Sequence, residues 1–316
     1  MSAMGPEDAY AIQVRHLTKR YGQLVAVDDV SFEVKFGEFF GFLGPNGAGK
    51  TTTLRILTGV VRPDGGAALV AGYAAGSTQA KQLSGVVPEM SNPYVDLSGW
   101  GNLMLMASLY GLPPKTARLR SESLLAELGL LERRHDPVKT YSKGMRQRLV
   151  LCMGLVSDPK VLFLDEPTSG LDVQSARLIK GMLRRLNEEG KTIFLTTHDM
   201  DEANQLCERV GVINKGRMVA VDAPESLRMA VSPMHSVEIS FDRAPEVDAL
   251  AHLPGVSSVQ KTGDKYRLYT ENPGELVVSL VNHACSAGLR IVSLNTLSPS
   301  LEDAFVALTE KEVFHD

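Results

Sequence analysis

The stretch GPNGAGKT, Gly44 to Thr51, is the part of the sequence that decides the fold. It matches the pattern G-x-x-x-x-G-K-[S/T] and stands between the apolar run FFGFL and the helix-forming run TTTLRIL. Glycines let such a loop curl so that several backbone N–H groups point at phosphate oxygens, and the following helix N-terminus adds partial positive charge. The pattern therefore predicts a phosphate-binding loop in which Lys50 reaches the terminal phosphates and Thr51 ligates magnesium.

The run VLFLDEP, Val161 to Pro167, carries the second predicted element. A buried strand here would place Asp165 at the carboxyl edge of a parallel sheet, where the ligands of such sheets collect. Asp165 suits magnesium, and Glu166 beside it is a candidate general base for an attacking water. His198, in LTTHD at the end of another apolar run, is placed to touch the γ-phosphate. The alternatives are a polar strand end for the acid pair and a structural role for the histidine.

The order of apolar runs indicates an α/β fold. Strands are predicted at 11–14, 39–43, 161–164, 192–197 and 210–213. Between two of them, QSARLIKGMLRRLNEE repeats apolar residues at near 3.6 spacing and predicts an amphipathic helix. Such alternation implies a sheet covered by helices. Residues 90–157 lack strand patterns and carry helical runs, which predicts a helical insertion.

The pattern changes after Ser232. The runs HSVEISF, SSVQKTG, KYRLYT and RIVSLNT alternate like half-buried strands, and helical runs lie near 246–252, 274–287 and 300–309. The order βαββαβ plus a last helix predicts a small ferredoxin-like α+β sandwich. Residues 233–316 hold 6 Lys or Arg and 12 Asp or Glu, a charge of −6 that leaves +2 for the rest. We therefore predict two domains, 10–232 and 233–316, with a helical subdomain at about 90–157 in the first.

Composition and charge exclude several classes of protein. A net charge of −4 and a pI near 6.0 argue against binding nucleic acid through phosphate neutralisation. Cys152, Cys207 and Cys285 fit neither a disulfide framework nor a zinc pattern, which predicts buried free thiols in a reducing compartment. The N-terminus lacks a signal-peptide core, and the uncharged segment 97–114 is too polar to span a bilayer. The sequence thus predicts a soluble protein with no membrane span of its own.

These elements and YSKGM, Tyr141 to Met145, resemble in order and spacing the ATP-binding subunit of an ABC transporter. The resemblance covers about residues 11–230 and implies a P-loop ABC ATPase fold with a mixed sheet and a helical insertion. It implies ATP and Mg²⁺ as cofactors. The nucleotide contacts that it implies are Tyr21, which would stack on adenine, Gly44, Pro45, Asn46, Gly47, Ala48, Gly49, Lys50, Thr51, Thr52, Ser142 and Gly144.

The resemblance also implies which residues act in catalysis and which bind the metal. The resemblance implies Glu166, His198 and Lys50 as catalytic residues, and Thr51, Asp165 and Glu89 as metal ligands. Glu89, in GVVPEM, falls where the family usually has glutamine, an exchange that keeps a metal-ligating oxygen and changes the local charge. SGLD, 169–172, matches the loop that crosses between two such domains.

The signature segment departs from the family pattern. It usually reads LSGGQ, whereas here Lys143 and Met145 replace glycine and glutamine. Ser142 is expected to cap a helix whose first N–H groups face outward and form an anion site. The resemblance places that site against the γ-phosphate held by a second, antiparallel copy. One chain would therefore supply half of each of two sites.

The function implied is an ATPase subunit that dimerises, as a homodimer, around ATP and Mg²⁺ and powers a separate integral-membrane permease. This implies a cytoplasmic protein at the inner face of the cell membrane. The C-terminal extension resembles that of exporters of drugs, lipids or other small molecules. The run 103–110 is expected either to receive the permease's coupling helix or to pack in the core.

Two other classes remain as alternatives. A soluble ABC ATPase acting outside transport usually carries two cassettes or a long coiled-coil insertion, and neither pattern is in this sequence. A GTPase switch needs an Asn-Lys-x-Asp stretch, which Asn214 to Arg217 does not complete.

Overall fold

The computed structural model describes residues 10–90, 92–231, 235–297, 301 and 304–305. The chain separates into two compact units, residues 1–223 and 224–316. The sequence places the boundary later, after 232, because strand-like alternation begins only there. The difference is helix α8, Pro224–Val231, which belongs to the second unit.

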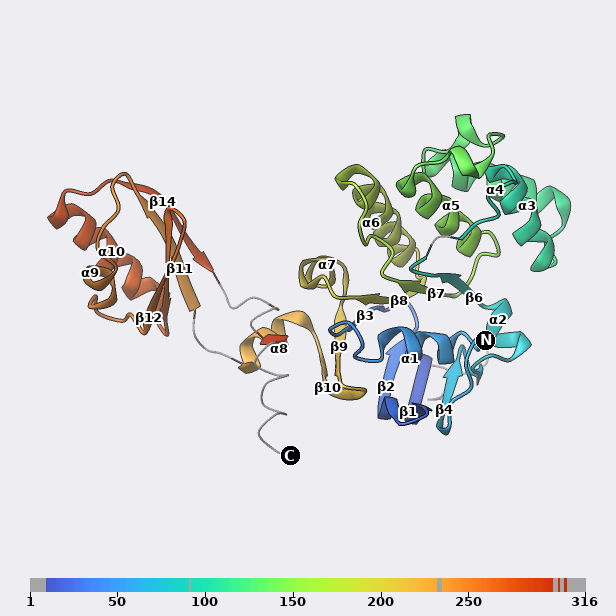
Figure 1. The fold of residues 1–316 in the computed structure, drawn as a ribbon, viewed down its shortest axis with the longest axis horizontal. Coiled ribbons are helices and arrows are strands. Elements are labelled where there is room, and N and C mark those ends of the chain that lie inside the picture. Colours follow the sequence, from blue (N-terminus) through green and yellow to red (C-terminus); the bar gives the residue numbers. More distant parts are fainter. Residues whose placement is uncertain (1–9, 91, 232–234, 298–300, 302–303, 306–316) are drawn as a thin grey trace, which may run out of the picture. The chain divides into compact units, whose positions relative to one another are not determined.

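The first unit is built on a mostly parallel sheet. Its strands pair in the order β10-β9-β3-β8-β7-β6, and among the described pairs only β9 with β10 is antiparallel. The strands are β3 (Phe39–Leu43), β6 (Ser84–Val87), β7 (Val161–Asp165), β8 (Thr192–Thr197), β9 (Arg209–Asn214) and β10 (Arg217–Asp222). Every residue of β3, β7 and β8 is buried, as expected for strands covered on both faces. Because parallel strands end at one edge, the segments after these three strands meet there (Figure 1).

A second sheet flanks the first. It has the order β2-β1-β4-β5 and consists of β1 (Tyr10–Tyr21), β2 (Leu24–Lys35), β4 (Gly65–Val70) and β5 (Tyr73–Ala74). The sequence predicts only a short strand at 11–14, because register shifts along the β1–β2 pair interrupt the period-2 alternation of both strands. Helix α1, Lys50–Leu57, packs against β2 and β4 of this sheet and against β7 and β8 of the main sheet (Figure 1).

Helices complete the first unit. The segment 90–157 contains α3 (Gly99–Leu109), α4 (Pro114–Glu127), α5 (Lys143–Leu155) and two 3-10 turns, and its described residues form no strand. These helices lie together at one end of the unit (Figure 1). Helix α2 is Thr78–Gln82, and the amphipathic helix predicted from 174 is α6, Val173–Glu188. Helix α7, Met200–Leu206, follows β8 and packs against β3 and β8.

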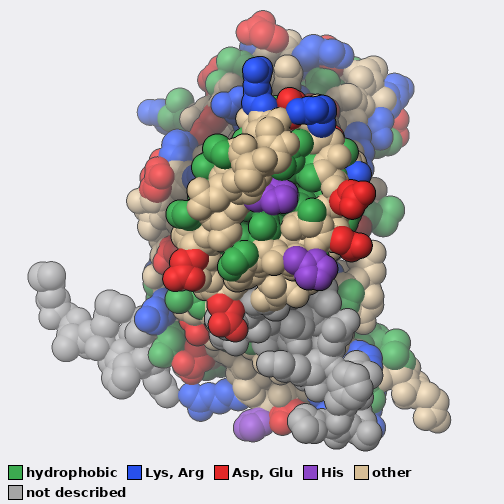
Figure 2. Space-filling view, turned by 90° about the vertical axis from the view of Figure 1, so that its left-hand side faces the viewer, with side chains coloured by type: hydrophobic (Ala, Val, Ile, Leu, Met, Phe, Trp, Pro, Cys, Tyr) green, Lys and Arg blue, Asp and Glu red, His purple; other side chains and the backbone are tan. Residues whose placement is uncertain are grey.

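The described elements of the second unit follow one another along the chain in the predicted order βαββαβ. Its elements are β11 (His235–Phe241), α9 (Val247–Ala251), β12 (Ser258–Thr262), β13 (Lys265–Thr270), α10 (Pro273–Ala287) and β14 (Ile291–Leu297). The antiparallel order β12-β13-β11-β14 is that of a ferredoxin-like sheet, and its core joins Val237, Ile239 and Leu268 to Leu276 and Leu280 of α10. Figure 2 shows hydrophobic and histidine side chains in the middle of one face, with acidic and basic ones toward its edges. The helix predicted at 300–309 falls mostly outside the described residues.

Two further expectations concern the burial of the cysteines and the lack of a membrane-spanning helix. All three cysteines are free; Cys152 and Cys207 are buried, and burial raises the pKa of both thiols. The prediction of a buried thiol is wrong for Cys285, which lies on the exposed side of α10. In the part of the chain that the structure describes, no helix is both long enough and apolar enough to cross a membrane.

Candidate functional site

The loop between β3 and α1 requires its glycines. Gly47 and Gly49 have φ values of +81° and +110°, which glycine adopts without steric cost. A Cβ atom on Gly44 would lie 2.4 Å from the carbonyl oxygen of Ile213, and one on Gly49 would lie 2.4 Å from that of Ala26. The loop therefore takes its curled shape only with glycine at these positions.

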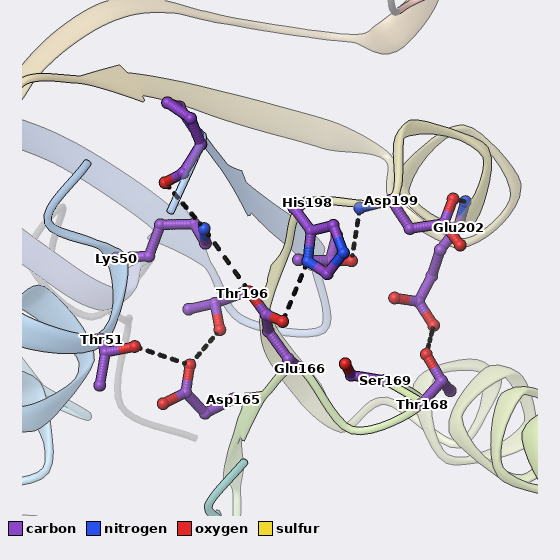
Figure 3. A network of polar contacts seen from close by, with 12 residues as sticks. Lys50, Thr51, Asp165, Glu166, Thr168, Ser169, Thr196, His198, Asp199 and Glu202 are labelled. Carbon is purple, nitrogen blue, oxygen red and sulfur yellow. Dashed lines mark hydrogen bonds and ion pairs between the residues drawn. The ribbon is translucent and has the colours of Figure 1, made fainter. Parts of the chain in front are cut away.

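Lys50 lies at the start of α1 and points back into this loop. Its side chain is buried, and Nζ donates to the carbonyl oxygens of Gly44 at 2.7 Å and Pro45 at 3.2 Å. The same ammonium lies 3.5 Å from Oε1 of Glu166 (Figure 3). The structure thus brings the lysine of the loop and the second acid of the VLFLDEP run together.

Asp165 ends β7 beside the first helical turn of α1. Thr51 Oγ1 lies 3.4 Å from Oδ1 of Asp165, and Thr196 of the neighbouring strand β8 donates its hydroxyl to the same oxygen at 2.5 Å (Figure 3). Hydroxyl and carboxylate oxygens are the donor set that Mg²⁺ prefers in proteins, so Thr51 and Asp165 fit that ion. No group of three or more His, Cys, Asp or Glu side chains among the described residues can hold a metal ion.

Glu166 follows with its backbone in the left-handed region. Its φ is +45°, a conformation that costs a residue with a Cβ about 1–2 kcal/mol. Its N–H donates to the carbonyl oxygen of Thr196 at 3.0 Å, and Oε2 lies 3.0 Å from Nδ1 of His198 (Figure 3). The Glu166 carboxylate is therefore held between Lys50 and His198. The hydrogen bond to Thr196 helps to hold the strained backbone of Glu166 in place.

The signature segment starts helix α5. Ser142 is the helix N-cap, as predicted, and its Oγ accepts from the N–H of Met145 at 3.2 Å. Gly144 packs on the start of α6, because a Cβ there would lie 2.3 Å from Oγ of Ser175. Lys143 Nζ donates to the carbonyl oxygen of Ser169 at 3.1 Å. The N-terminus of α5 is thus packed against the loop 169–172 of its own chain.

Tyr21 and Glu89 lie apart from these contacts. Tyr21 is the last residue of β1 and is 46% exposed, and Lys19 Nζ lies 5.5 Å from its ring centroid. Glu89 is exposed and lines a hollow of about 370 Å³ with Lys143 and Arg146. In the described part of the chain, no hydrogen bond or ion pair joins Glu89 to the predicted metal ligands Thr51 and Asp165.

Sequence reasoning missed three polar residues beside the acid pair. Thr196 fixes Asp165, and Thr168 donates its hydroxyl to Oε1 of Glu202 at 2.6 Å (Figure 3). The run TIFLTT held a signal for Thr196, since a hydroxyl at the end of a buried strand needs a partner. The pair Thr168 and Glu202 is 34 residues apart and left no local pattern.

The chain is similar to known proteins over most of its length. A family model described as "ABC transporter" matches residues 27–169, which include the phosphate loop, the signature and the acid pair. The Nod factor export ATP-binding protein I of Ralstonia nicotianae is 39% identical over 96% of this chain and 94% of its own length. The chain belongs to the ABC transporter ATPases. The linearmycin resistance ATP-binding protein LnrL of Bacillus subtilis is 35% identical over 94% of this chain and 98% of its own.

A solved bacterial ABC transporter cassette, described as dimeric, matches this ABC ATPase with a TM-score of 0.62 and 25% identity. The match covers 67% of this chain and 98% of that one. The two curated relatives, in contrast, align with at least 94% of this ABC ATPase. These alignments therefore extend into the C-terminal unit. The protein is therefore an ATP-hydrolysing subunit of the ABC transporter family, and most of its C-terminal unit lies within the region that aligns with those relatives.

Proposed function

We propose that two copies of this chain close around two ATP·Mg²⁺ units and thereby drive a separate membrane permease that exports its substrate. The observation that carries the proposal is the division of the site within one chain. Lys50, Asp165, Glu166 and His198 converge at the edge of the main sheet. The hydroxyl of Ser142 accepts from the N–H of Met145 in its own helix and, among the described residues, makes no hydrogen bond to any of these four. A second copy would supply the missing anion site, and the dimeric cassette with the same fold supports this arrangement.

The reaction we propose is in-line attack of water on the γ-phosphorus of ATP, which breaks the bond between that phosphorus and the β–γ bridging oxygen and releases ADP and phosphate. Glu166 orients the water and takes its proton, and His198 keeps the carboxylate directed toward it. Lys50 Nζ neutralises charge on the transferred phosphoryl group, together with the helix start at Ser142 of the second copy. Mg²⁺, when bound, supplies further charge neutralisation on the phosphates, and Thr51 and Asp165 would hold it, with Glu89 as an additional proposed ligand.

Export is favoured by what the curated relatives are named for. One is named for Nod factor export and the other for linearmycin resistance, and both align over the C-terminal unit as well. We therefore propose a drug, a lipid or another small molecule as the transported substance. The chain would lie on the cytoplasmic side of the cell membrane, held there by the permease. Work outside transport is not favoured by these relatives.

An exposed apolar surface on the first unit suits a permease. The segment between β6 and α3 exposes Met90, Tyr94, Val95 and Leu97, and Leu109 is exposed at the end of α3. Leu109 and Tyr110 also line a cavity of about 310 Å³ next to α1 and β6. Leu103, in contrast, is buried core, the residues 104–106 are half-buried, and Leu109 is the exposed leucine of the run 103–110. We propose that a short apolar helix of the permease docks here.

This docking surface gives the test of the transport role. Tyr94 is 59% exposed, so Tyr94→Glu should leave folding and the ATPase activity of the purified protein unchanged. A carboxylate placed in an apolar interface loses its hydration, which weakens binding to the permease. When cells are fractionated, we therefore expect the wild type to sediment with the membranes and Tyr94→Glu to stay in the soluble fraction. Leu119→Glu, a change at a 61% exposed leucine of α4, is the matched control and should stay with the membranes. Equal membrane association of Tyr94→Glu and wild type would contradict the proposed surface.

Lys143 offers a test of the departure from the family signature. Its hydrogen bond to Ser169 tethers the loop 169–172, so Lys143→Ala should lower the maximal ATPase rate while leaving the affinity for ATP unchanged. Since both groups are exposed, we expect a loss of about 1 kcal/mol, or roughly fivefold. Steady-state phosphate release measures it, with Lys143→Arg retaining activity and Lys139→Ala as the control for an exposed lysine nearby. A wild-type ATPase rate in Lys143→Ala would show that the hydrogen bond between Lys143 and Ser169 has no role in turnover.

A further inference from the structure

Glu202 is a buried carboxylate that the proposed reaction does not use. It lies in the first turn of α7, and its side chain is 1% exposed. Its Oε1 accepts the hydroxyl of Thr168 at 2.6 Å, and the same oxygen lies 3.7 Å from Nζ of Lys180 on α6. A carboxylate buried to this degree needs a positive charge and a donor nearby, and these two residues supply them.

The local sequence alone predicts a different hydrogen-bond partner for the Glu202 carboxylate. Asp199 caps α7, and Glu202 stands three residues later, the spacing at which a glutamate usually reaches back to the N-cap N–H. In this structure the N–H of Asp199 donates instead to Oγ1 of Thr197 at 3.0 Å. The Glu202 carboxylate is thereby left to contact a different segment, the one that follows β7 (Figure 3).

The two segments joined in this way carry the catalytic pair. Thr168 is two residues after Glu166, and Pro167 between them restricts the backbone. Glu202 is four residues after His198, on the helix that begins directly behind it. The two segments are therefore connected twice, by Glu166 to His198 and by Thr168 to Glu202 (Figure 3).

We propose that Glu202 is a positioning residue for hydrolysis. Through Thr168 it holds the left-handed backbone of Glu166 against the segment that carries His198, and Lys180 compensates its charge. The proposal rests on the proposed role of Glu166 as the base, because it assigns to Glu202 the placement of that carboxylate.

Stability alone does not require a carboxylate at this place. A buried ionic network can often be replaced by apolar side chains of similar volume without loss of stability. Apolar contacts, however, do not fix a direction, whereas a charge-assisted hydrogen bond fixes both distance and angle. Such a bond suits the segment of Thr168, because Glu166, two residues before it, must present its carboxylate accurately.

The test compares variants of the full-length protein at Thr168. Thr168→Val removes the hydroxyl and keeps the shape of the side chain. We expect kcat for ATP hydrolysis to fall between about tenfold and a hundredfold, because misplacement of a reacting group by about 1 Å can cost about a hundredfold. KM for ATP should change by less than about twofold, because the nucleotide contacts are untouched. Thr168→Ser restores the hydroxyl and should restore most of the turnover.

The control is a buried threonine in the same unit. Thr192, at the far end of β8, is fully buried, and its Oγ1 accepts from the N–H of Gly37 at 2.9 Å. Thr192→Val should lower the melting temperature and leave kcat of the folded protein unchanged. The double variant Thr168→Val/Glu202→Gln should turn over no more slowly than Thr168→Val alone, since both changes act on one contact.

The outcomes separate this proposal from the assignment of the base. If Glu166→Gln is inactive while Thr168→Val and Glu202→Gln keep the wild-type kcat, the positioning role of Glu202 is wrong and the base assignment stands. If Glu166→Gln keeps its turnover, the base assignment fails whatever Thr168→Val does. A loss of kcat in Thr192→Val equal to that in Thr168→Val would reduce the role of Thr168 to general stability.

Discussion

Glu166→Gln is expected to lose at least about a hundredfold in ATP turnover, the lower part of the contribution that a general base makes. The amide keeps the size of the side chain and a hydrogen bond to His198, but it cannot take a proton from water. ATP binding should persist, because the phosphate loop and Lys50 are unchanged. The bound nucleotide then remains unhydrolysed and should hold two copies together.

Two measurements check this expectation. Phosphate release gives the loss of turnover, and a sizing column run with ATP and Mg²⁺ should show a dimer that the wild type does not accumulate. Glu132→Gln, at an exposed glutamate of a 3-10 turn, is the control for removal of one negative charge. Turnover of Glu166→Gln near that of Glu132→Gln would refute the assignment of the base.

Ser142→Ala is expected to abolish the ATP-dependent dimer while leaving nucleotide binding to the monomer intact. Ser142 is exposed, and we propose that its hydroxyl donates to the γ-phosphate held by the second copy. A hydrogen bond to a charged group contributes about 1.5–3 kcal/mol, and a symmetric dimer contains two of them. The dimer should therefore weaken by roughly 3 kcal/mol or more, which is more than about a hundredfold in affinity.

The experiment is best done in the Glu166→Gln background, where the dimer accumulates. Loss of an N-cap also costs about 1 kcal/mol of helix stability, so a matched control is needed. Ser98 caps α3 in the same way, accepting from the N–H of Gly101 at 3.0 Å. Ser98→Ala should dimerise as the parent does. Dimerisation of Ser142→Ala to the same extent as Ser98→Ala would remove Ser142 from the interface.

Four strands of the main sheet, β3, β7, β8 and β9, were predictable because their signals are local, whereas β6 and β10 were not predicted. The runs FFGFL and TIFLTT coincide with β3 and β8, and the glycine-rich stretch between strand and helix places the phosphate loop. The hairpin of β1 and β2 was not predictable in the same way. Its register shifts and the positive φ of Asp29 displace side chains from the alternating pattern.

The site was predictable only in its residue types. Lys50, Thr51, Asp165, Glu166 and His198 stand in runs whose order indicates the chemistry, and the sheet brings them together. The left-handed backbone of Glu166 has no sequence signal, because glutamate rarely adopts it. The contact of Thr168 with Glu202 depends on how two strand ends meet, which one chain's residue pattern does not specify.

The positive φ of Glu166 also sets a limit on how this enzyme can become more heat-resistant. Glycine at this position would relieve about 1–2 kcal/mol of backbone strain, yet it would remove the proposed base and leave the buried ammonium of Lys50 without its carboxylate partner. The strain at this one residue is therefore not available as a source of thermal stability. Stabilising changes that preserve activity must lie elsewhere, in parts of the chain where the backbone already has its preferred conformation.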